Sequence, residues 1–270
     1  MNIIDGKKIA GTIINRLKKL PRGGKIFAAI MVGENPASLS FLKQKEKVAH
    51  ECGIDFRIYT YKEEQWTNDT LRHEVGRISA QKSVGGVIVQ LPLPEKFNAQ
   101  YIVNAIDSRK DVDVLGERAL GSFYAERSKV VPPTVGVVFR IMEELAIKIL
   151  DKNVAVVGLG RLVGKPIALF LIKKVRNLIL CDKNSDLGLL QCADIVISGV
   201  GKSHIIKKEH LKNGVIVIDF GYFLDGGTLK GDVDFDALSN YAEYATPTPG
   251  GTGPLLVAKL FENFYALNQV

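Results

Sequence analysis

The feature that most restricts the fold of this chain is a short apolar run followed by a glycine-rich turn and then by the start of a helix. Residues 154–157 are four consecutive apolar residues, typical of a strand buried on both faces, and residues 167–172 are apolar over helical length. Gly158, Gly160 and Gly164 lie between them in the spacing G-x-G-x-x-x-G. Glycines in such a turn let a phosphate approach the backbone N–H groups at a helix start. The stretch therefore predicts a phosphate cradle, although a tight turn without a ligand would use the same residues.

An acidic residue and further strands follow this turn. Residues 178–181 form a second apolar run that ends on Asp182, 24 residues after Gly158, where a carboxylate can accept the ribose hydroxyls of NAD. Residues 194–198 and 215–219 repeat the pattern, and glycines follow each of them. Four strands with connecting helices predict a parallel sheet of the Rossmann type.

Length and composition restrict the class of protein. A chain of 270 residues predicts about two domains, and 46% hydrophobic content predicts globular cores. The sequence has no run of 18 apolar residues, and five Lys or Arg lie in its first twenty residues, so we expect no membrane span, no signal peptide and a cytoplasmic location. The net charge of +7 is spread along the chain. It suits a polyanionic ligand such as a dinucleotide or a polyglutamylated cofactor, whereas no basic block with interleaved aromatic residues supports nucleic acid as the partner.

The cysteines and histidines do not indicate a metal site. Cys52, Cys181 and Cys192 are an odd number in no metal-like spacing, and we expect them to be reduced core residues. The four histidines form no cluster with ligand spacing, so we expect no protein-held metal.

A lysine interrupts the apolar stripe of a helix in the N-terminal half. Residues 26–32 form an apolar strand, and Ser38 is expected to cap a helix over residues 39–52. Lys45 lies in the middle of the stripe, whose apolar members are Phe41, Val48, Ala49 and Cys52. Its ammonium can reach water along this surface, or it can be partly desolvated, with a lowered pKa that suits proton transfer. The pattern leaves both alternatives open.

Gln90 closes a later apolar strand. Residues 87–90 run into two prolines, which cannot continue a central strand, so Gln90 lies at a carboxyl end, where ligands bind in open α/β sheets. A glutamine at this position can also simply close the strand through backbone hydrogen bonds, without a role in ligand binding. Asp111 and Asp113 could hold a divalent cation, but one D-x-D in a turn more often has a turn role. A linker near Pro132 predicts the domain boundary, and an amphipathic helix is expected near the C-terminus.

With these pieces in view, the chain resembles the bifunctional methylenetetrahydrofolate dehydrogenase/cyclohydrolase family over nearly its whole length. The signatures are Gly33-Glu-Asn-Pro-Ala-Ser38 followed by Lys45 and Lys47, then Val89-Gln-Leu-Pro-Leu-Pro94, Lys110-Asp-Val-Asp113 and Pro249-Gly-Gly-Thr-Gly-Pro254. The resemblance implies an α/β fold of two domains. A folate-binding catalytic domain would span residues 1–131 and 250–270, closed by the C-terminal helix, and an inserted Rossmann-type dinucleotide-binding domain would span residues 132–249. It also implies a homodimer assembled through the Rossmann domains.

The resemblance further implies two reactions in one-carbon metabolism, with a link to purine biosynthesis. 5,10-Methylenetetrahydrofolate would be oxidised by hydride transfer to NAD or NADP, and the methenyl product would be hydrolysed to 10-formyltetrahydrofolate. Lys45 falls on the family's catalytic lysine, Gln90 would orient and tune it, and Asp113 would hold the pterin edge. The implied folate contacts are Phe41, Val89, Leu91, Pro249, Gly250, Gly251 and Gly253. The implied cofactor contacts are Gly158, Leu159, Gly160, Arg161, Asp182, Lys183, Gly221 and Tyr222.

Several positions depart from the family pattern. Phe41 replaces a substrate-stacking tyrosine and lacks its hydroxyl, so we expect intact hydride transfer with a weakened cyclohydrolase. After the Lys110–Asp113 stretch, Val114-Leu115 replace the family's usual Gly-Phe. In the cofactor half, Leu159-Gly160 replace the Arg-Ser of the cofactor loop, and Asp182-Lys183 replace a His and a Ser. Tyr222 replaces an isoleucine. Asp182 would accept both ribose hydroxyls and repel a 2′-phosphate, which Lys183 and Arg161 would partly offset. We therefore expect a preference for NAD.

Two functions of different classes remain open from the sequence. One is an active enzyme of folate metabolism, and the other is a non-catalytic dinucleotide-binding or regulatory relative. Lys45, Gln90 and Asp113 favour the enzyme, because a binding module does not need a lysine on an apolar stripe. Reductive chemistry on another pterin is a third, weaker alternative.

Overall fold

The computed structural model describes residues 1–21 and 23–269, and the chain divides into two compact units. The three-stranded unit comprises Gly11–Pro133 and Val257–Val270, and the six-stranded unit comprises Met1–Ala10 and Thr134–Leu256. The division falls inside two helices, α1 (Gly6–Leu17) and α8 (Thr252–Asn268). Each unit builds α/β layers around a parallel sheet, which confirms the predicted fold class.

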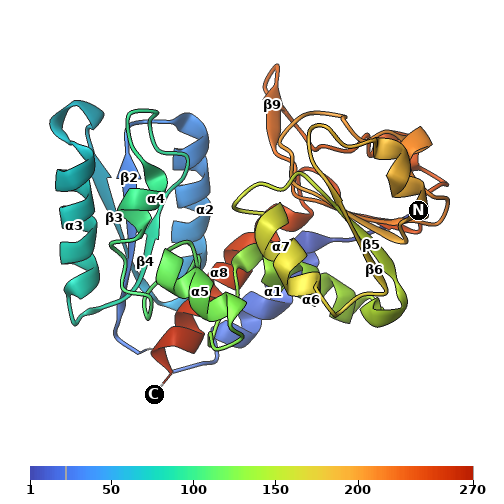
Figure 1. Ribbon diagram of the computed structural model, residues 1–270. Helices are drawn as coiled ribbons and strands as arrows, with labels where there is room; N and C mark the ends of the chain where they lie inside the picture. Colours follow the sequence, from blue (N-terminus) through green and yellow to red (C-terminus); the bar gives the residue numbers. More distant parts are fainter. Residues whose placement is uncertain (22, 270) are drawn as a thin grey trace. The chain divides into compact units, whose positions relative to one another are not determined.

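The sheet of the three-stranded unit places β2 (Ile26–Val32) between β3 (Asp55–Tyr61) and β4 (Val84–Val89). The linking helices α2 (Pro36–Cys52) and α3 (Asn68–Ala80) lie on opposite sides of this sheet in Figure 1. Every residue of β2 is buried, because helices cover both of its faces. This burial explains why its sequence is apolar throughout rather than alternating.

The two faces of β2 contribute to different parts of the core. Ala28 and Ile30 belong to a cluster with residues of α3 and of the short helix α4 (Ala99–Val103). On the opposite face, the Phe27 ring stacks on Phe264 of α8 at 4.9 Å between centroids. The C-terminal helix thus packs against the sheet formed by the N-terminal half of the chain.

The start of α2 differs from the sequence prediction. Ser38 was expected to cap the helix, but Asn35 is the N-cap, and its side-chain oxygen accepts a hydrogen bond from the Ser38 N–H at 3.0 Å. Pro36 takes the first helical position, where its missing N–H is not needed. The helix therefore begins three residues earlier, and Ser38 is buried inside its first turn.

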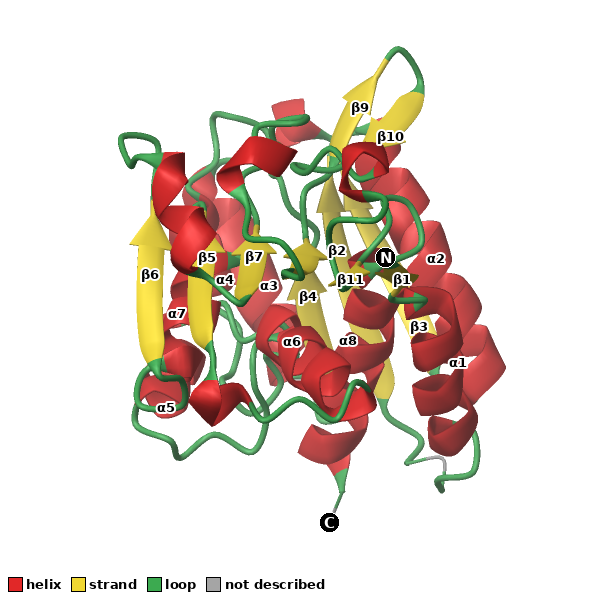
Figure 2. Ribbon diagram, turned by 90° about the vertical axis from the view of Figure 1, so that its right-hand side faces the viewer, coloured by secondary structure: helices red, strands yellow, loops and turns green. Residues whose placement is uncertain are grey.

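The sheet of the six-stranded unit is parallel throughout and has the order β1-β11-β8-β7-β5-β6. Figure 2 shows β6, β5 and β7 side by side at one end of it. The four predicted strands are β5 (Asn153–Val157), β6 (Asn177–Cys181), β7 (Ile195–Ser198) and β8 (Ile216–Asp219). The linker leads into α6 (Pro133–Glu144), and α7 (Gly164–Leu171) connects β5 to β6.

The prediction that helices connect all four strands was wrong. Between β6 and β7 the chain forms a 3₁₀ segment, η3 (Leu187–Cys192), and between β7 and β8 another, η4 (Lys208–His210). Asp186 caps the first of these by accepting from the Gly188 N–H at 2.9 Å. Such short segments close by local i→i+3 bonds and do not need the long apolar stripe that marks an α-helix.

Several elements had no counterpart among the predictions. They are β1 (Asn2–Ile3), α5 (Glu117–Tyr124), β11 (Tyr244–Ala245), the short 3₁₀ segments η1 (Glu63–Gln65), η2 (Ile149–Asp151) and η5 (Asp236–Leu238), and an antiparallel hairpin of β9 (Phe223–Asp225) and β10 (Thr228–Lys230). The hairpin projects from the six-stranded unit in Figure 1.

The division into units differs from the expected domain boundaries at three places, one of which is residues 132–133, which group with the three-stranded unit. Residues 1–10 and 250–256 group with the six-stranded unit, because β1 pairs with β11 and Gly6 packs against Gly251. A Cβ on Gly6 would lie only 1.7 Å from the Gly251 carbonyl oxygen. Which unit binds folate and which binds the dinucleotide is not decided by this division and stays a prediction.

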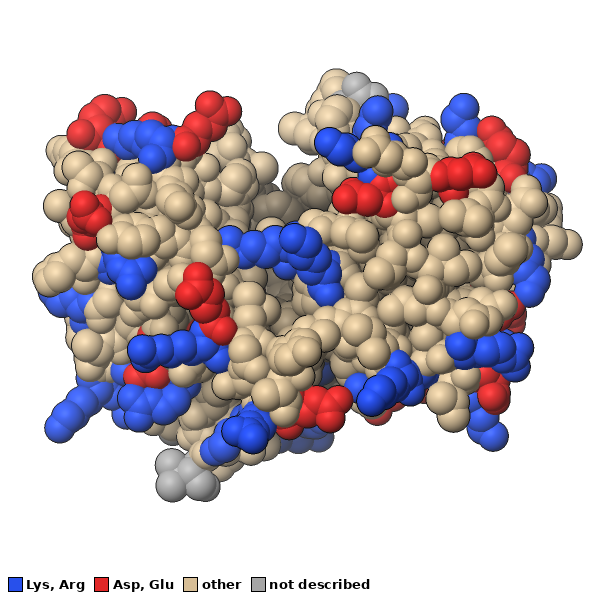
Figure 3. Space-filling view, in the orientation of Figure 1, with Lys and Arg blue, Asp and Glu red and all other residues tan. Residues whose placement is uncertain are grey.

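Two of the three cysteines lie in the core, and one lies at the surface. Cys52 and Cys181 are buried, as expected, but Cys192 is exposed at the end of η3, so its assignment to the core was wrong. Within residues 1–21 and 23–269, no helix has the length and apolar character that crossing a membrane requires. On the face shown in Figure 3, basic and acidic side chains are interspersed over each unit, as the even spread of charge along the sequence predicted.

Candidate functional site

Lys45 and Gln90 meet in the three-stranded unit. Lys45 lies on α2, and its Nζ donates a hydrogen bond to Gln90 Oε1 at 2.8 Å. The lysine side chain is half-buried, and burial lowers its pKa, while the negative charge of Asp113 acts in the opposite direction. Its ammonium is therefore held by protein groups instead of extending into water, which favours the second of the two alternatives drawn from the sequence.

Gln90 is held in one orientation. It follows the last residue of β4, is 8% exposed, and its backbone N–H donates to the Ile30 carbonyl oxygen at 2.8 Å. Its side-chain Nε2 donates to the Leu91 carbonyl oxygen at 2.8 Å. With the amide nitrogen engaged in this way, Oε1 is presented to the lysine.

The two aspartates of the Lys110–Asp113 stretch have different environments. Asp111 is 1% exposed, accepts from the Leu115 N–H at 3.0 Å and the Gly116 N–H at 2.7 Å, and has its pKa raised to about 6, chiefly by burial. Asp113 is half-buried, and burial raises its pKa while the Lys45 charge lowers it. Asp111 thus organises the turn, whereas Asp113 interacts electrostatically with Lys45.

A metal at this aspartate pair has little structural support. Asp111 directs one carboxylate oxygen to two backbone N–H groups, as turn-forming aspartates do. Over residues 1–21 and 23–269, His, Cys, Asp and Glu side chains form no group of three that could hold a metal ion.

The predicted folate contacts beside Lys45 lie on the same two elements as Lys45 and Gln90. Phe41 is half-buried on α2, four residues before Lys45, and therefore one helical turn away. Val89 is the buried last residue of β4, and Leu91 is half-buried directly after Gln90. The peptide bond between Leu91 and Pro92 is cis.

The predicted tail contacts are shaped by close backbone approaches within the six-stranded unit. Gly250 has φ +106°, which only glycine adopts readily, and a Cβ on Gly251 would lie 2.6 Å from the Pro247 carbonyl oxygen. Gly253, in contrast, has open space around the position of a Cβ. Pro249 follows a cis peptide bond, as Pro92 does.

The glycine turn after β5 has the geometry of a cradle. Gly158 has φ +82°, and a Cβ there would lie 2.8 Å from the Gly199 carbonyl oxygen. A Cβ on Gly164, the first residue of α7, would lie 1.9 Å from the Gly158 carbonyl oxygen. Both positions therefore require glycine, whereas Gly160 is exposed and has open space around it. The neighbouring Leu159 and Arg161 are half-buried.

The turn fits a phosphate group. Among the described side chains, none caps the start of α7 at Val163, so the helix begins with backbone groups at the cradle. The open space at Gly160 allows an anion to approach those groups, and the helix dipole favours it. The residues present are therefore those that a pyrophosphate requires.

Asp182 lies next to this turn. β5 pairs with β6 so that Val157 is level with Cys181, and the Gly158 N–H donates to the Cys181 carbonyl oxygen at 2.8 Å. Asp182 is exposed, and its Oδ1 accepts from the Lys183 N–H at 2.9 Å. Strand pairing thus brings together the glycine turn and the acidic residue that the sequence separates by 24 positions.

Gly221 and Tyr222 follow β8, two strands away from β5 in the sheet. The Gly221 N–H donates to Asp219 Oδ1 at 2.6 Å, and Tyr222 is exposed. Nothing in the sequence pattern singled out Asp219 or its buried neighbour Asp232. The available signal was an aspartate at the end of an apolar strand, a residue type that is rarely buried unless it has partners.

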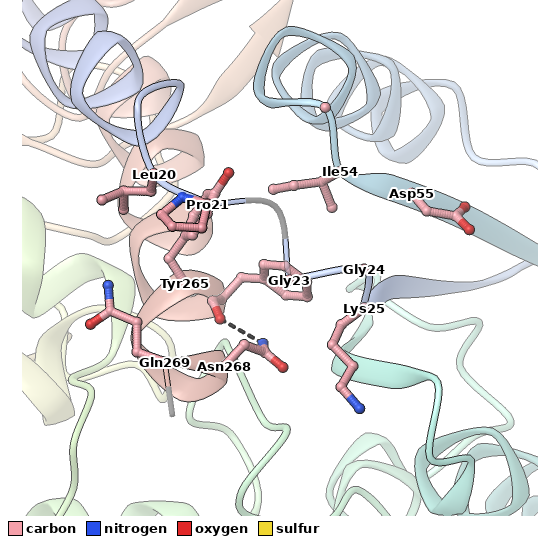
Figure 4. A pocket seen from close by; sticks show the side chains of 12 residues that line it. Leu20, Pro21, Gly23, Gly24, Lys25, Ile54, Asp55, Tyr265, Asn268 and Gln269 are labelled. Carbon is pink, nitrogen blue, oxygen red and sulfur yellow. Dashed lines mark hydrogen bonds between the residues drawn. The ribbon is translucent and has the colours of Figure 1, made fainter.

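A cavity of about 760 Å³ lies elsewhere in the three-stranded unit (Figure 4). It adjoins Lys25 and Asp55, at the beginnings of β2 and β3, and residues 264–269 of α8 and the segment that follows it. Gln90 follows the carboxyl end of the same sheet. The cavity is therefore separate from the Lys45 and Gln90 site.

Comparison with known proteins agrees with this geometry. Residues 4–113 match the tetrahydrofolate dehydrogenase/cyclohydrolase catalytic domain, and residues 132–270 match the NAD(P)-binding domain of the same family. The bifunctional protein FolD of Halothermothrix orenii is 36% identical over 97% of this chain and 95% of its own length.

Solved structures give the same relationship. The bifunctional enzyme FolD of Campylobacter jejuni, a methylenetetrahydrofolate dehydrogenase/cyclohydrolase, has a TM-score of 0.93 with 31% identity, covering 99% of this chain and 98% of that one. The Trypanosoma brucei enzyme, solved with NADP and an inhibitor, has a TM-score of 0.91 with 28% identity, covering 98% and 96%. The chain belongs to the tetrahydrofolate dehydrogenase/cyclohydrolase family.

Proposed function

We propose that Lys45, Gln90 and Asp113 carry out the chemistry of this chain, which is a methylenetetrahydrofolate dehydrogenase and methenyltetrahydrofolate cyclohydrolase. The observation that carries this assignment is the 2.8 Å hydrogen bond from Lys45 Nζ to Gln90 Oε1. A lysine on an apolar helix stripe, held by a fixed glutamine and influenced by the half-buried Asp113 carboxylate, is arranged for proton handling rather than for solubility.

Each of the three residues has a separate task. With its pKa lowered by burial, Lys45 can polarise the folate one-carbon unit as an ammonium and accept a proton from the attacking water as an amine. Gln90 orients the lysine, because its own amide is fixed by the Leu91 carbonyl. Asp113 accepts N–H groups of the pterin edge, since a carboxylate offers only acceptors.

The remaining folate contacts keep their proposed roles. Phe41 offers a ring face one turn from Lys45, and Val89 and Leu91 flank Gln90. The glycine-rich tail contributes Pro249, Gly250, Gly251 and Gly253.

The nicotinamide cofactor supplies the hydride acceptor of the first reaction. We assign its pyrophosphate to the backbone of Gly158, Leu159 and Gly160, with Arg161 beside them, and further contacts to Gly221 and Tyr222. Asp182 would accept the ribose hydroxyls, and Lys183 would partly offset its charge toward a 2′-phosphate. The position of Asp182 at the end of β6 supports NAD over NADP, because a carboxylate there repels a 2′-phosphate.

A homodimer through the six-stranded unit is also proposed. β6 closes one end of the sheet, and Leu180 on it is 45% exposed. Ile172 and Leu189, on either side of β6 in the sequence, are also exposed. An apolar edge strand suits pairing with a second copy. Sedimentation of the protein over a range of concentrations distinguishes the dimer from a monomer.

A spectrophotometric assay with methylenetetrahydrofolate and each dinucleotide tests the function. Formation of both the methenyl and the formyl product is the expected result. Dinucleotide binding without turnover of any folate would instead identify the chain as a non-catalytic relative.

A further inference from the structure

Two buried carboxyl groups lie against each other at the carboxyl end of the six-stranded sheet. Asp219 ends β8 and is 3% exposed, and Asp232 follows β10 and is fully buried. Each aspartate is packed against a glycine, because a Cβ on Gly221 would lie 2.5 Å from Asp232 Oδ1 and a Cβ on Gly231 would lie 2.2 Å from Asp219 Oδ2. Burial and the Asp232 charge together raise the pKa of Asp219 to about 7. Burying two neighbouring carboxyl groups is energetically unfavourable, so the pair is expected to have a structural or functional role.

The Asp232 carboxylate accepts four hydrogen bonds from residues 198–202, which include the last residue of β7 and the loop that follows it. Its Oδ2 accepts from Ser198 Oγ and from the Val200 N–H, both at 2.6 Å. Its Oδ1 accepts from the Gly201 N–H at 2.8 Å and the Lys202 N–H at 2.9 Å. Three consecutive backbone N–H groups pointing at one anion form a nest, and the protein fills this nest with its own carboxylate.

Asp219 holds the segment that follows β8. Its Oδ1 accepts from the Gly221 N–H at 2.6 Å, and its Oδ2 accepts from the Val233 N–H at 3.0 Å. Because Gly221 precedes the β9–β10 hairpin and Val233 follows it, this carboxyl group ties the two ends of the hairpin together.

The loop of residues 199–202, which is hydrogen-bonded to Asp232, packs against the glycine turn at residues 158–161. A Cβ on Gly158 would lie 2.8 Å from the Gly199 carbonyl oxygen and 2.9 Å from Val200 Cγ2. A Cβ on Gly199 would in turn meet the Val163 side chain at the start of α7. Any shift of residues 199–202 would therefore change the space available at the glycine turn. Loops at the carboxyl ends of strands are where open parallel sheets bind their ligands.

We infer that Asp232, with Asp219, is a positioning residue that holds the loops after β7 and β8 in the shape that accepts the dinucleotide. This inference rests on the proposed function only in taking the glycine turn as the dinucleotide site. Because Asp232 occupies the N–H groups of residues 200–202, these groups are not available to the cofactor phosphates. The pyrophosphate is left to the turn at residues 158–161.

The test is the dissociation constant of NAD and NADP for Asp232→Asn, measured by titration calorimetry without folate. The amide keeps the volume but replaces one acceptor oxygen by a donor facing an N–H group, so the loop must move. We expect the dissociation constant to rise at least ~10-fold, equivalent to about 1.4 kcal/mol. Hydrolysis of methenyltetrahydrofolate should stay within about twofold of wild type, because that step transfers no hydride. Asp236→Asn, an exposed aspartate of η5, is the matched control.

A second variant keeps the inference testable if Asp232→Asn does not fold. Ser198→Ala removes one of the four hydrogen bonds and leaves the charge, so it should raise the dissociation constant about threefold, less than Asp232→Asn. Unchanged dinucleotide affinity in a folded Asp232→Asn, or in Ser198→Ala, would overturn the positioning role. So would a parallel loss of dinucleotide binding and methenyl hydrolysis, which indicates general destabilisation. If the wild type binds dinucleotide but turns over no folate, the proposed function fails while the affinity comparison still decides this inference.

Discussion

Phe41 is the residue in the folate half where the family resemblance implies a tyrosine. It lies one turn from Lys45 on α2 and has a ring without a hydroxyl. A hydrogen bond from such a hydroxyl contributes about 0.5–1.5 kcal/mol, or up to ~3 kcal/mol when it touches a charge. We therefore expect hydride transfer to survive the loss of this hydroxyl and the water step near the lysine to be weakened.

The prediction is that Phe41→Tyr raises the ratio of cyclohydrolase to dehydrogenase activity by ~3- to 10-fold. In the wild type, the methenyl intermediate should accumulate during turnover, and it should decrease in the variant. Following both products by absorbance measures the ratio directly. Phe139→Tyr, at an exposed ring of α6, is the control. An unchanged ratio would show that the missing hydroxyl is not limiting.

At the residue scale, we propose that Asp182 decides the choice between NAD and NADP. One of its oxygens is used by the Lys183 N–H, and the exposed carboxylate stands directly beyond β6. Charges about 4 Å apart near a protein surface interact by a few kcal/mol, so we expect kcat/KM to favour NAD by ~10- to 1000-fold. Asp182→Ser should shrink or reverse this preference, with Asp151→Ser as an exposed control. A clear NADP preference that is the same in Asp182→Ser is the contrary result.

At the scale of elements, α2 matters because it carries both Phe41 and Lys45. Asn35 caps this helix by accepting from the Ser38 N–H, and losing such a cap costs about 1 kcal/mol. Asn35→Ala should therefore lower the free energy of unfolding in urea by ~0.5–2 kcal/mol, whereas Asn35→Asp should retain most of it. Equal destabilisation by both variants would mean that the stability lost in Asn35→Ala does not come from the side-chain acceptor.

The strands show which elements of the fold can be predicted from the sequence and which cannot. Continuous apolar runs located β2, β4 and β5, because a strand buried on both faces has to be apolar at every position. Two-residue strands such as β1 and β11 have no periodic pattern, and they form only because the rest of the sheet offers an edge. Their pairing is the tertiary effect that moved residues 1–10 into the six-stranded unit.

Local sequence patterns also cannot predict which site residues come close together in the fold. Helical spacing marked Lys45, and the prolines after β4 marked Gln90, but no local pattern relates two residues that are 45 positions apart. Only the pairing of β2 with β4, together with the packing of α2, brings these side chains within 2.8 Å. The Asp219 and Asp232 pair escaped prediction for the same reason, since the neighbours of Asp232 lie in two segments distant in the sequence, residues 198–202 and Gly221.

At the scale of the whole molecule, buried carboxyl groups make stability depend on pH. The pKa of Asp219 is raised to about 7 and that of Asp111 to about 6, against about 3.9 in an unfolded chain. Between these values the native state holds protons that the unfolded state has lost. Their stabilising contribution is thus fully present below about pH 4 and is lost as pH rises through 6 and 7.

We therefore expect these two groups to lower the free energy of unfolding as pH rises from 4 to 7, by about 1.4 kcal/mol per pH unit for each retained proton. Asp219→Asn should flatten this slope relative to wild type in urea unfolding at pH 5, 6, 7 and 8. Parallel curves for the two proteins would contradict the protonated state assigned to Asp219.

The whole molecule combines two reactions, and a single lysine is proposed to serve both. Removing a general acid or base lowers turnover by ~100-fold or more, so Lys45→Met should reduce dehydrogenase and cyclohydrolase turnover together by at least that factor. The dissociation constant for the dinucleotide should not change. Lys43→Met, at an exposed position on the same helix, should retain wild-type turnover.

The most direct test of the account given for Lys45 is therefore turnover of both reactions in Lys45→Met, measured beside Lys43→Met at saturating substrate. We predict a loss of at least ~100-fold in both activities for Lys45→Met alone. Near wild-type turnover in folded Lys45→Met, in either reaction, would contradict the assignment of Lys45 as the shared catalytic group.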